Sequence, residues 1–199
     1  MQFIGIDYSM SCPCMCIYGD NYYFSRFHYL TTVKKQTGAF LPSTIHSFHS
    51  IFGTLHPEYS TDTERFHNIS RHFLNLLPEY GNTRAAKQEN VRIMIEGYSM
   101  GSKGLVFNIA ENTGVLKQKL WECGYIFEVV PPTTIKKFAT GKGNADKDQM
   151  LEAFIKETHI DLKEHLTPDK KLGSPVTDII DAYYIARFCK EKWVGVSPV

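Results

Sequence analysis

The chain lacks long hydrophobic runs and lacks a strong excess of charge of either sign. In its 199 residues no apolar stretch approaches the roughly 18 that a membrane-spanning helix needs. A formal net charge of +1 argues against a protein that coats DNA, because phosphate contacts dominate such binding. The chain opens on a strand-like run with no signal-peptide pattern, so we expect a cytoplasmic protein. It also lacks internal repeats and low-complexity segments, which excludes repeat architectures.

The five cysteines lack the spacing of a zinc site. Zinc sites usually combine a CxxC-type pair with a distant second pair, and neither is present. Cys12, Cys14 and Cys16 alternate, so on a strand they share one face, where neighbours are poorly placed for a disulfide. We expect reduced thiols that pack in or near a strand.

The residues that are present predict one α/β domain over 1–199. A hydrophobic content of 43% and an aromatic content of 13% are enough for a full core. Gly19-Asp20-Asn21 separates two strand-like segments, which indicates a hairpin and hence three antiparallel strands at the start. Later the order strand, helix, strand indicates a βαβ unit with parallel strands. The prediction is an α/β fold with a mixed sheet, three antiparallel strands and then parallel strands, flanked by helices.

Each expected element rests on local signals. Thr61-Asp62-Thr63-Glu64 fits a capping box, followed by an apolar stripe at helical spacing. The segment 31–60 is expected to be a loop-rich insertion. Strands are expected at 2–7, 14–18, 21–30, 91–96 and 125–130. Helices are expected at 43–52 (a short one), from 61 to about 78, at 105–122 and at 175–190, with two more that begin after the capping residues Thr133 and Asn144. A turn is expected at 141–143, and polar connections at 82–90 and 158–174.

Four acidic residues stand where elements begin or end. Asp7 ends the first apolar run and Glu96 ends the run that begins at Arg92. Asp178 and Asp181 lie three apart, on one face of the expected last helix. If the two strands are neighbours, all four acids can converge at one sheet edge, where they repel one another unless cations bind. A divalent-metal site for phosphoryl transfer on nucleic acid is therefore the leading hypothesis.

Each acid has a simpler interpretation when it is taken alone. Asp7 can be a turn former after a strand, and Glu96 can be a surface acid before a glycine turn. Asp178 can favour a helix N-terminus, which suits negative charge. Asp181 is harder to explain in this way, because its neighbours Ala182 and Tyr183 indicate a packed face. Together the four positions favour a common site.

Several of these stretches resemble the RuvC-type Holliday-junction resolvases of the RNase H-like superfamily, and especially their phage-encoded members. The most specific stretch places two lysines around a glycine turn before a helix. The resemblance covers roughly 1–30 and 61–190. The matching stretches are Gly5-Ile6-Asp7, Ile95-Glu96-Gly97-Tyr98, Ile135-Lys136 followed after eleven residues by Lys147, and Asp178-Ile179-Ile180-Asp181-Ala182.

The resemblance implies a role for each matching residue. The four acids would hold two Mg²⁺ ions, for which Mn²⁺ substitutes, and Lys147 with Lys136 would offset charge on the scissile phosphate. Branched DNA (four-way junctions and forks) would be the partner, bound by a homodimer in the cytoplasm, that of a host if the chain is phage-encoded. The implied DNA-binding residues are Tyr98, Lys103, Lys137 and Lys142. A wall role for Tyr98 and plain surface charge for the lysines stay open.

The chain also departs from the family pattern. The 31–60 segment is longer than the usual connection, which leaves substrate preference open, and Tyr8-Ser9-Met10 lacks the Pro-Gly often found after the first acid. Other functions remain open too: a nuclease for RNA–DNA hybrids or flaps on the same scaffold, or a non-catalytic module that binds branched DNA. An actin-like or sugar-kinase ATPase is disfavoured by the length and by the lack of a second glycine-rich phosphate loop.

Overall fold

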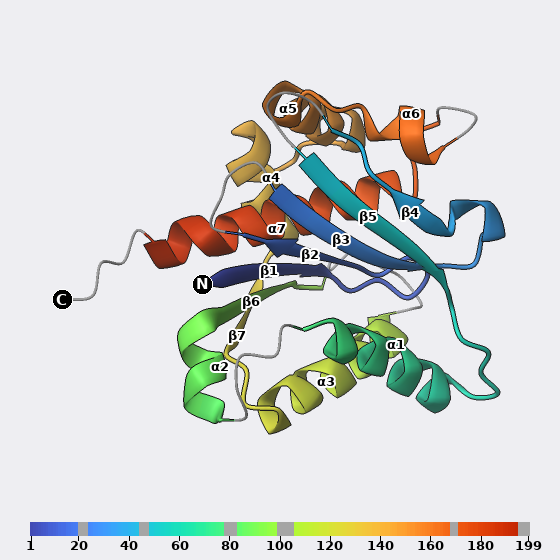
Figure 1. Cartoon of the computed structure of the whole chain (residues 1–199), viewed down its shortest axis with the longest axis vertical. Coiled ribbons are helices and arrows are strands. Elements are labelled where there is room, and N and C mark those ends of the chain that lie inside the picture. Colours follow the sequence, from blue (N-terminus) through green and yellow to red (C-terminus); the bar gives the residue numbers. More distant parts are fainter. Residues whose placement is uncertain (20–23, 44–47, 78–82, 99–105, 168–170, 195–199) are drawn as a thin grey trace.

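The computed structural model describes residues 1–19, 24–43, 48–77, 83–98, 106–167 and 171–194. Within them the strands form one mixed sheet in the order β4-β5-β3-β2-β1-β6-β7 (Figure 1). The strands are β1 (Gln2–Asp7), β2 (Cys14–Tyr18), β3 (Phe24–Thr31), β4 (Gly38–Phe40), β5 (Phe48–Leu55), β6 (Val91–Glu96) and β7 (Phe127–Val130).

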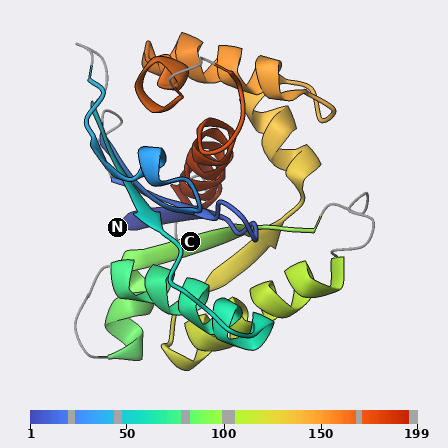
Figure 2. The ribbon, with the colours of Figure 1, turned by 90° about the vertical axis from the view of Figure 1, so that its right-hand side faces the viewer.

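Helices cover both faces of the sheet. One layer contains α7 with α4, α5 and α6, and the opposite layer contains α1, α2 and α3 (Figure 2). The helices are η1 (Lys34–Gln36, a 3-10 turn), α1 (Asp62–Leu76), α2 (Arg84–Asn90), α3 (Val106–Glu122), α4 (Pro132–Thr140), α5 (Lys147–Thr158), α6 (Leu162–Leu166) and α7 (Val176–Val194). Among the described residues, no helix has both the length and the apolar character needed to cross a bilayer.

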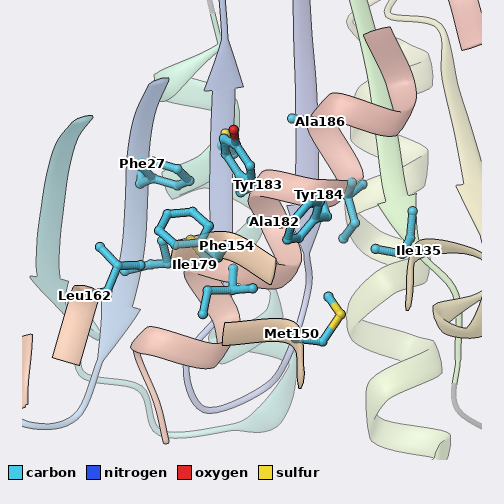
Figure 3. Close-up of a cluster of buried hydrophobic side chains, with 14 of the residues drawn as sticks. Phe27, Ile135, Met150, Phe154, Leu162, Ile179, Ala182, Tyr183, Tyr184 and Ala186 are labelled. Carbon is cyan, nitrogen blue, oxygen red and sulfur yellow. The ribbon is translucent and has the colours of Figure 1, made fainter. Parts of the chain in front are cut away.

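The pleat of each strand divides the core between the two layers. In β1, Ile4 and Ile6 belong to the cluster on the α1–α3 side, whereas Phe3 belongs to the cluster around α7. Successive side chains of a strand point to opposite faces, so Gly5 and Asp7 share the α7 side with Phe3. On that side, residues of α4, α5, α6 and α7 pack together against the sheet (Figure 3).

The expected order of the first and middle strands is confirmed. β1, β2 and β3 are antiparallel neighbours, and β6 pairs in parallel with both β1 and β7. Cys14 and Cys16 lie together on the α7 face of β2, where both are fully buried and free, so the expected thiol packing is also confirmed. The proposed turn residues Asp20 and Asn21 lie outside the described residues.

The segment 31–60 differs from the expected loop with a short helix. Phe48–Leu55 is a strand that pairs in parallel with the whole of β3, and Gly38–Phe40 pairs with it in turn. The predicted helix at 43–52 is therefore wrong where the structure describes it. The error arises because strand pairing is non-local: β5 exists because β3 offers it an edge, and no local pattern records that partner.

Other local predictions also need correction. Arg84–Asn90 is a helix capped by Thr83, not a polar linker. Asp146 caps α5 with a full capping box, so Asn144 is not the cap, and Thr133 lies inside α4, which begins at Pro132. The connection 158–174 is less polar than expected, because it contains α6 and three buried apolar side chains, those of Ile160, Leu162 and Leu166.

Candidate active site

Two of the four acids end neighbouring strands. The parallel register of β1 and β6 pairs Ile6 with Ile95, so Asp7 and Glu96 both follow at the same sheet edge. Met94 belongs to the core around α7, and Glu96 is two residues further, on the same face. Asp7 and Glu96 therefore point to the same side of the sheet.

Helix α7 brings the second pair of acids to this edge. A Cβ built at Gly5 would lie 2.3 Å from both the Ala182 carbonyl oxygen and the Ala186 nitrogen, so the helix backbone lies directly on β1. Asp178 is one turn before Ala182, about 6 Å along the axis, and Asp7 is two residues beyond Gly5, about 6.6 Å along the strand. Helix α7 runs opposite to β1 (Figure 1). Asp178 and Asp7 therefore both lie toward the end of the sheet where β1 ends.

The pKa values of the four acids indicate that their charges interact. Burial raises the pKa of Asp7 well above its ordinary value, and the other three acids raise it further. Burial and then the charge of Asp181 raise the pKa of Glu96 to about 8. Burial and the charge of Asp178 raise the pKa of Asp181 to about 7. Burial also raises the pKa of Asp178 itself, against hydrogen bonds that favour its carboxylate. Ionisation of one acid thus opposes ionisation of its neighbours.

Two lysines face this cluster. Lys136 of α4 lowers the pKa of Glu96 and Asp181, and Lys147 of α5 lowers the pKa of Asp7, Asp178 and Asp181. Lys136, Lys147 and Asp181 line one cavity of about 80 Å³. The two lysines that the sequence places around a glycine turn therefore meet the acids from the helix side.

The donor atoms suit a hard divalent cation. Carboxylate oxygens are ligands that Mg²⁺ and Mn²⁺ prefer, and cations would offset the burial and the mutual repulsion that raise the acid pKa values. As they stand, no three His, Cys, Asp or Glu side chains in the described ranges are grouped closely enough to hold one ion. The chemistry of the site therefore fits such ions, although the side chains are not already gathered around one point.

Comparison with known proteins gives the fold. No protein-family model matches the chain. A segment of 53 residues is 40% identical to the crossover junction endodeoxyribonuclease RuvC of Synechococcus sp. (strain CC9311); it spans 27% of this chain and 33% of that protein. The Thermus thermophilus RuvC structure aligns over 98% of this chain and 97% of its own, with a TM-score of 0.55 and 13% identity. This chain has the RuvC fold.

A second Thermus thermophilus RuvC structure, described as a complex with a Holliday junction substrate, aligns over 100% of this chain and 99% of its own. Its TM-score is 0.56 and its sequence identity is 14%. The resemblance to RuvC-type enzymes is therefore confirmed, while a phage origin stays a prediction. The RNase H-like mixed sheet expected from the sequence is confirmed as well.

The expected DNA-binding residues of this RuvC fold do not all join the acid cluster. Tyr98 follows β6 and is 39% exposed, with the Lys117 ammonium 5.2 Å from its ring centroid. Lys137 is exposed on α4, and Lys142 lines a different cavity of about 540 Å³ between α4 and α5. Lys103 lies outside the described residues.

Other side chains support the loop after Asp7 and were missed by sequence reasoning. The Arg65 guanidinium of α1 donates to the Met10 carbonyl at 2.6 Å. His56 contacts the Ser11 carbonyl through Nε2 at 3.0 Å, and because a carbonyl only accepts, this nitrogen carries the proton. These contacts join residues 55 and 45 positions apart, so no local sequence signal predicts them.

Proposed function

We propose that this chain is a metal-dependent, structure-selective endonuclease that cleaves Holliday junctions or other branched DNA. The observation that carries the proposal is the set of four acids on one side of one sheet edge, opposed by two lysines. The RuvC fold and the local identity to a RuvC protein support the choice of substrate class. The matched segment is a third of that relative, so the activity is inferred from the site and the fold together.

The acids would hold the cofactor and the lysines would bind substrate charge. Two Mg²⁺ or Mn²⁺ ions held by Asp7, Glu96, Asp178 and Asp181 would supply an activated water and stabilise the leaving oxygen. Lys147 is exposed at the start of α5 and Lys136 is partly buried on α4. Both ammonium groups can face a phosphate that lies over the acids, where they offset the charge that builds up during cleavage.

Paired cuts on a four-way junction would require two copies of the chain, because the substrate has two-fold symmetry. Helix α3 is the proposed interface. It presents two large apolar side chains to solvent, Phe107 at 80% exposure and Trp121 at 64%. Burial of these two side chains against a second copy would remove apolar surface from water and favour association. Sedimentation equilibrium of the wild type and of Phe107→Ser tests this part of the proposal.

The activity is tested on matched synthetic substrates. Labelled four-way junction, Y-fork, RNA–DNA hybrid and linear duplex are incubated separately with Mg²⁺, Mn²⁺ or EDTA. Metal-dependent paired nicks near the branch of the junction are the expected result. Forks cut equally well would indicate a general debranching nuclease, and preferred cleavage of the hybrid would indicate an RNase H-like activity. Junction binding without any cleavage would replace the proposal by a non-catalytic binding module.

A further inference from the structure

The segment between β3 and α1 reaches the acid-bearing edge of the sheet. It adds η1, β4 and β5 beyond β3, and because β5 is parallel to β3 it ends near the edge where β1 ends. Near the end of this segment, just after β5, the side chain of His56 contacts the loop after Asp7. The first turn of the segment, η1, contacts Ser174, just before the acid-bearing helix α7, through Gln36.

The Gln36 side chain joins η1 to Ser174, which with Pro175 directly precedes α7. Its Nε2 donates to the Ser174 carbonyl oxygen at 3.1 Å, and its Oε1 accepts from the Thr31 hydroxyl at 2.8 Å. A carbonyl oxygen can only accept, so the amide nitrogen must face Ser174 and the amide oxygen must face Thr31. Thr31 therefore holds the amide in the orientation that reaches Ser174.

The backbone of Gln36 is held as well. Its N–H donates to the Val33 carbonyl at 2.9 Å, and its own carbonyl accepts from the Tyr29 hydroxyl. A Cβ at Gly53 of β5 would lie 2.2 Å from the Gln36 carbonyl oxygen, so β5 must have glycine here for η1 to approach. The turn that presents Gln36 is thus fixed against β3 and β5.

Ser174 connects this turn to an acid of the site. The Thr177 N–H donates to the Gly173 carbonyl at 3.2 Å, so Ser174 lies within the turn that begins α7. Ser174 lies four residues before Asp178, and its side chain hydrogen-bonds the Asp178 carboxylate, to which Thr177 Oγ1 also donates at 3.3 Å. A shift of Ser174 would therefore move a hydrogen-bond donor of Asp178, which is only 8% exposed.

We propose that Gln36 is a positioning residue for Asp178, acting through Ser174. The inference rests on the proposed metal-dependent cleavage and adds a role for the 31–60 segment, which tightens cation binding. Gln36 touches neither the acids nor the lysines that would meet substrate. Its loss should weaken the binding of the divalent cation and slow cleavage while the affinity for junction DNA stays unchanged.

The test uses Gln36→Met, which keeps the length and removes the amide, with Thr37→Val as the matched control. Thr37 lies next to Gln36, and its hydroxyl donates within η1 to the Lys34 carbonyl at 2.8 Å, without reaching Ser174. Mn²⁺ affinity of the DNA-free protein is measured by calorimetry, with the Mg²⁺ dependence of cleavage, junction affinity and the melting temperature in EDTA. Gln36→Met should weaken Mn²⁺ binding roughly two- to tenfold, as expected for one hydrogen bond. Thr37→Val should bind Mn²⁺ like the wild type.

A second variant keeps the test decisive if Gln36→Met folds poorly. Thr31→Val leaves Gln36 in place but frees its amide, so it should weaken Mn²⁺ binding in the same direction and to a smaller extent. Wild-type Mn²⁺ affinity in either variant, with only the melting temperature lowered, would overturn the positioning role and leave the proposed function standing. A wild-type chain that neither binds Mn²⁺ nor cleaves a branch would overturn the proposed function and this inference with it.

Discussion

When no cation is bound, individual acidic residues of the site lower the stability of the folded chain. Asp7 and Asp178 are each exposed by less than a tenth, and burial is the largest cause that raises the pKa of both. A buried carboxylate with like charges beside it costs free energy whenever it is ionised. Such an arrangement is typical of residues that serve a ligand, and it makes each acid testable by stability as well as by activity.

Asp7→Asn should abolish cleavage while junction binding is kept. The change removes one carboxylate from the proposed ion site, and we expect activity to fall by more than roughly 100-fold, because even outer partners of a metal site are worth roughly 10–100-fold. The same variant should melt at a higher temperature than the wild type in EDTA, since it relieves charge repulsion. Wild-type cleavage by this variant would remove Asp7 from the metal site.

Lys147→Ala should slow the chemical step far more than it weakens binding. We expect a loss of roughly 10²–10³ in the single-turnover rate at saturating junction, the scale seen when one group that stabilises transition-state charge is removed. Lys156→Ala is the control, because it removes an exposed lysine from the same helix, on the side of the larger cavity. If only the dissociation constant changed, Lys147 would be a contact to the DNA backbone instead.

At the scale of elements, the start of α5 shows how local chemistry places a functional side chain. Asp146 accepts from the Gln149 N–H, and the Gln149 side chain accepts from the Asp146 N–H, so the helix begins at Lys147. Gly141 ends α4 in the left-handed conformation that glycine tolerates best. These two signals set the short connection that brings Lys136 and Lys147 to one cavity.

Gly5→Ala should separate α7 from β1. The added Cβ would meet helix backbone, which cannot move aside by changing a rotamer, so the free energy of unfolding should fall by about 1–3 kcal/mol. Because α7 carries Asp178 and Asp181, cleavage should fall too. Chemical denaturation and the junction assay measure the two effects.

Gly114→Ala is the matched control for Gly5→Ala. This glycine lies in α3, and a Cβ there would meet nothing within 4 Å. Alanine should therefore raise the free energy of unfolding by roughly 0.5–1 kcal/mol, and the two variants are compared by this quantity alone, because Gly114 lies on the helix proposed as the interface. If both variants behaved alike, the close contact between β1 and α7 would not matter for the site.

At the scale of the whole molecule, the acid cluster links stability to pH. Glu96 and Asp181 have pKa values of about 8 and about 7 in the folded chain, above their ordinary values of 4.5 and 3.8. Between pH 6.5 and 8 the folded state thus binds more protons than the unfolded state, and its stability falls as pH rises. Burial lowers the pKa of His28, His56 and His72 from 6.5, so these histidines contribute a change of the opposite sign, which fades above about pH 7 because they are then neutral in both states.

The expected result is a melting temperature in EDTA that decreases from pH 6.5 to 8. Asp181→Asn should reduce this slope, because it removes one titrating group and its repulsion of Glu96. Mg²⁺ should raise the melting temperature most at pH 8, where the acids are ionised. A melting temperature that rises over the same range without a cation would contradict the clustering of the four acids.

Much of the fold follows from local patterns. The capping signal at Thr61 predicts the start of α1, and the buried run 91–96 with the helix after it predicts the parallel pair β6–β7. The positions of Asp7, Glu96 and the Asp178–Asp181 pair can be read as element ends from sequence alone. Such signals survive because they depend on residues a few positions apart.

The sequence by itself determined which side chains could lie near one another. The strand and helix periods set the face on which each acid lies, and the positions of the acids set the element end at which each stands. Only the tertiary structure decided that the acids lie close enough for their charges to interact, because the distance between Asp7 and Asp178 depends on the contact of Gly5 with the backbone of α7. The same holds for β5, which forms on the edge of β3, and for the bond from Gln36 to Ser174 across 138 positions. Contacts over such separations are set by packing of the whole chain, which no local pattern contains.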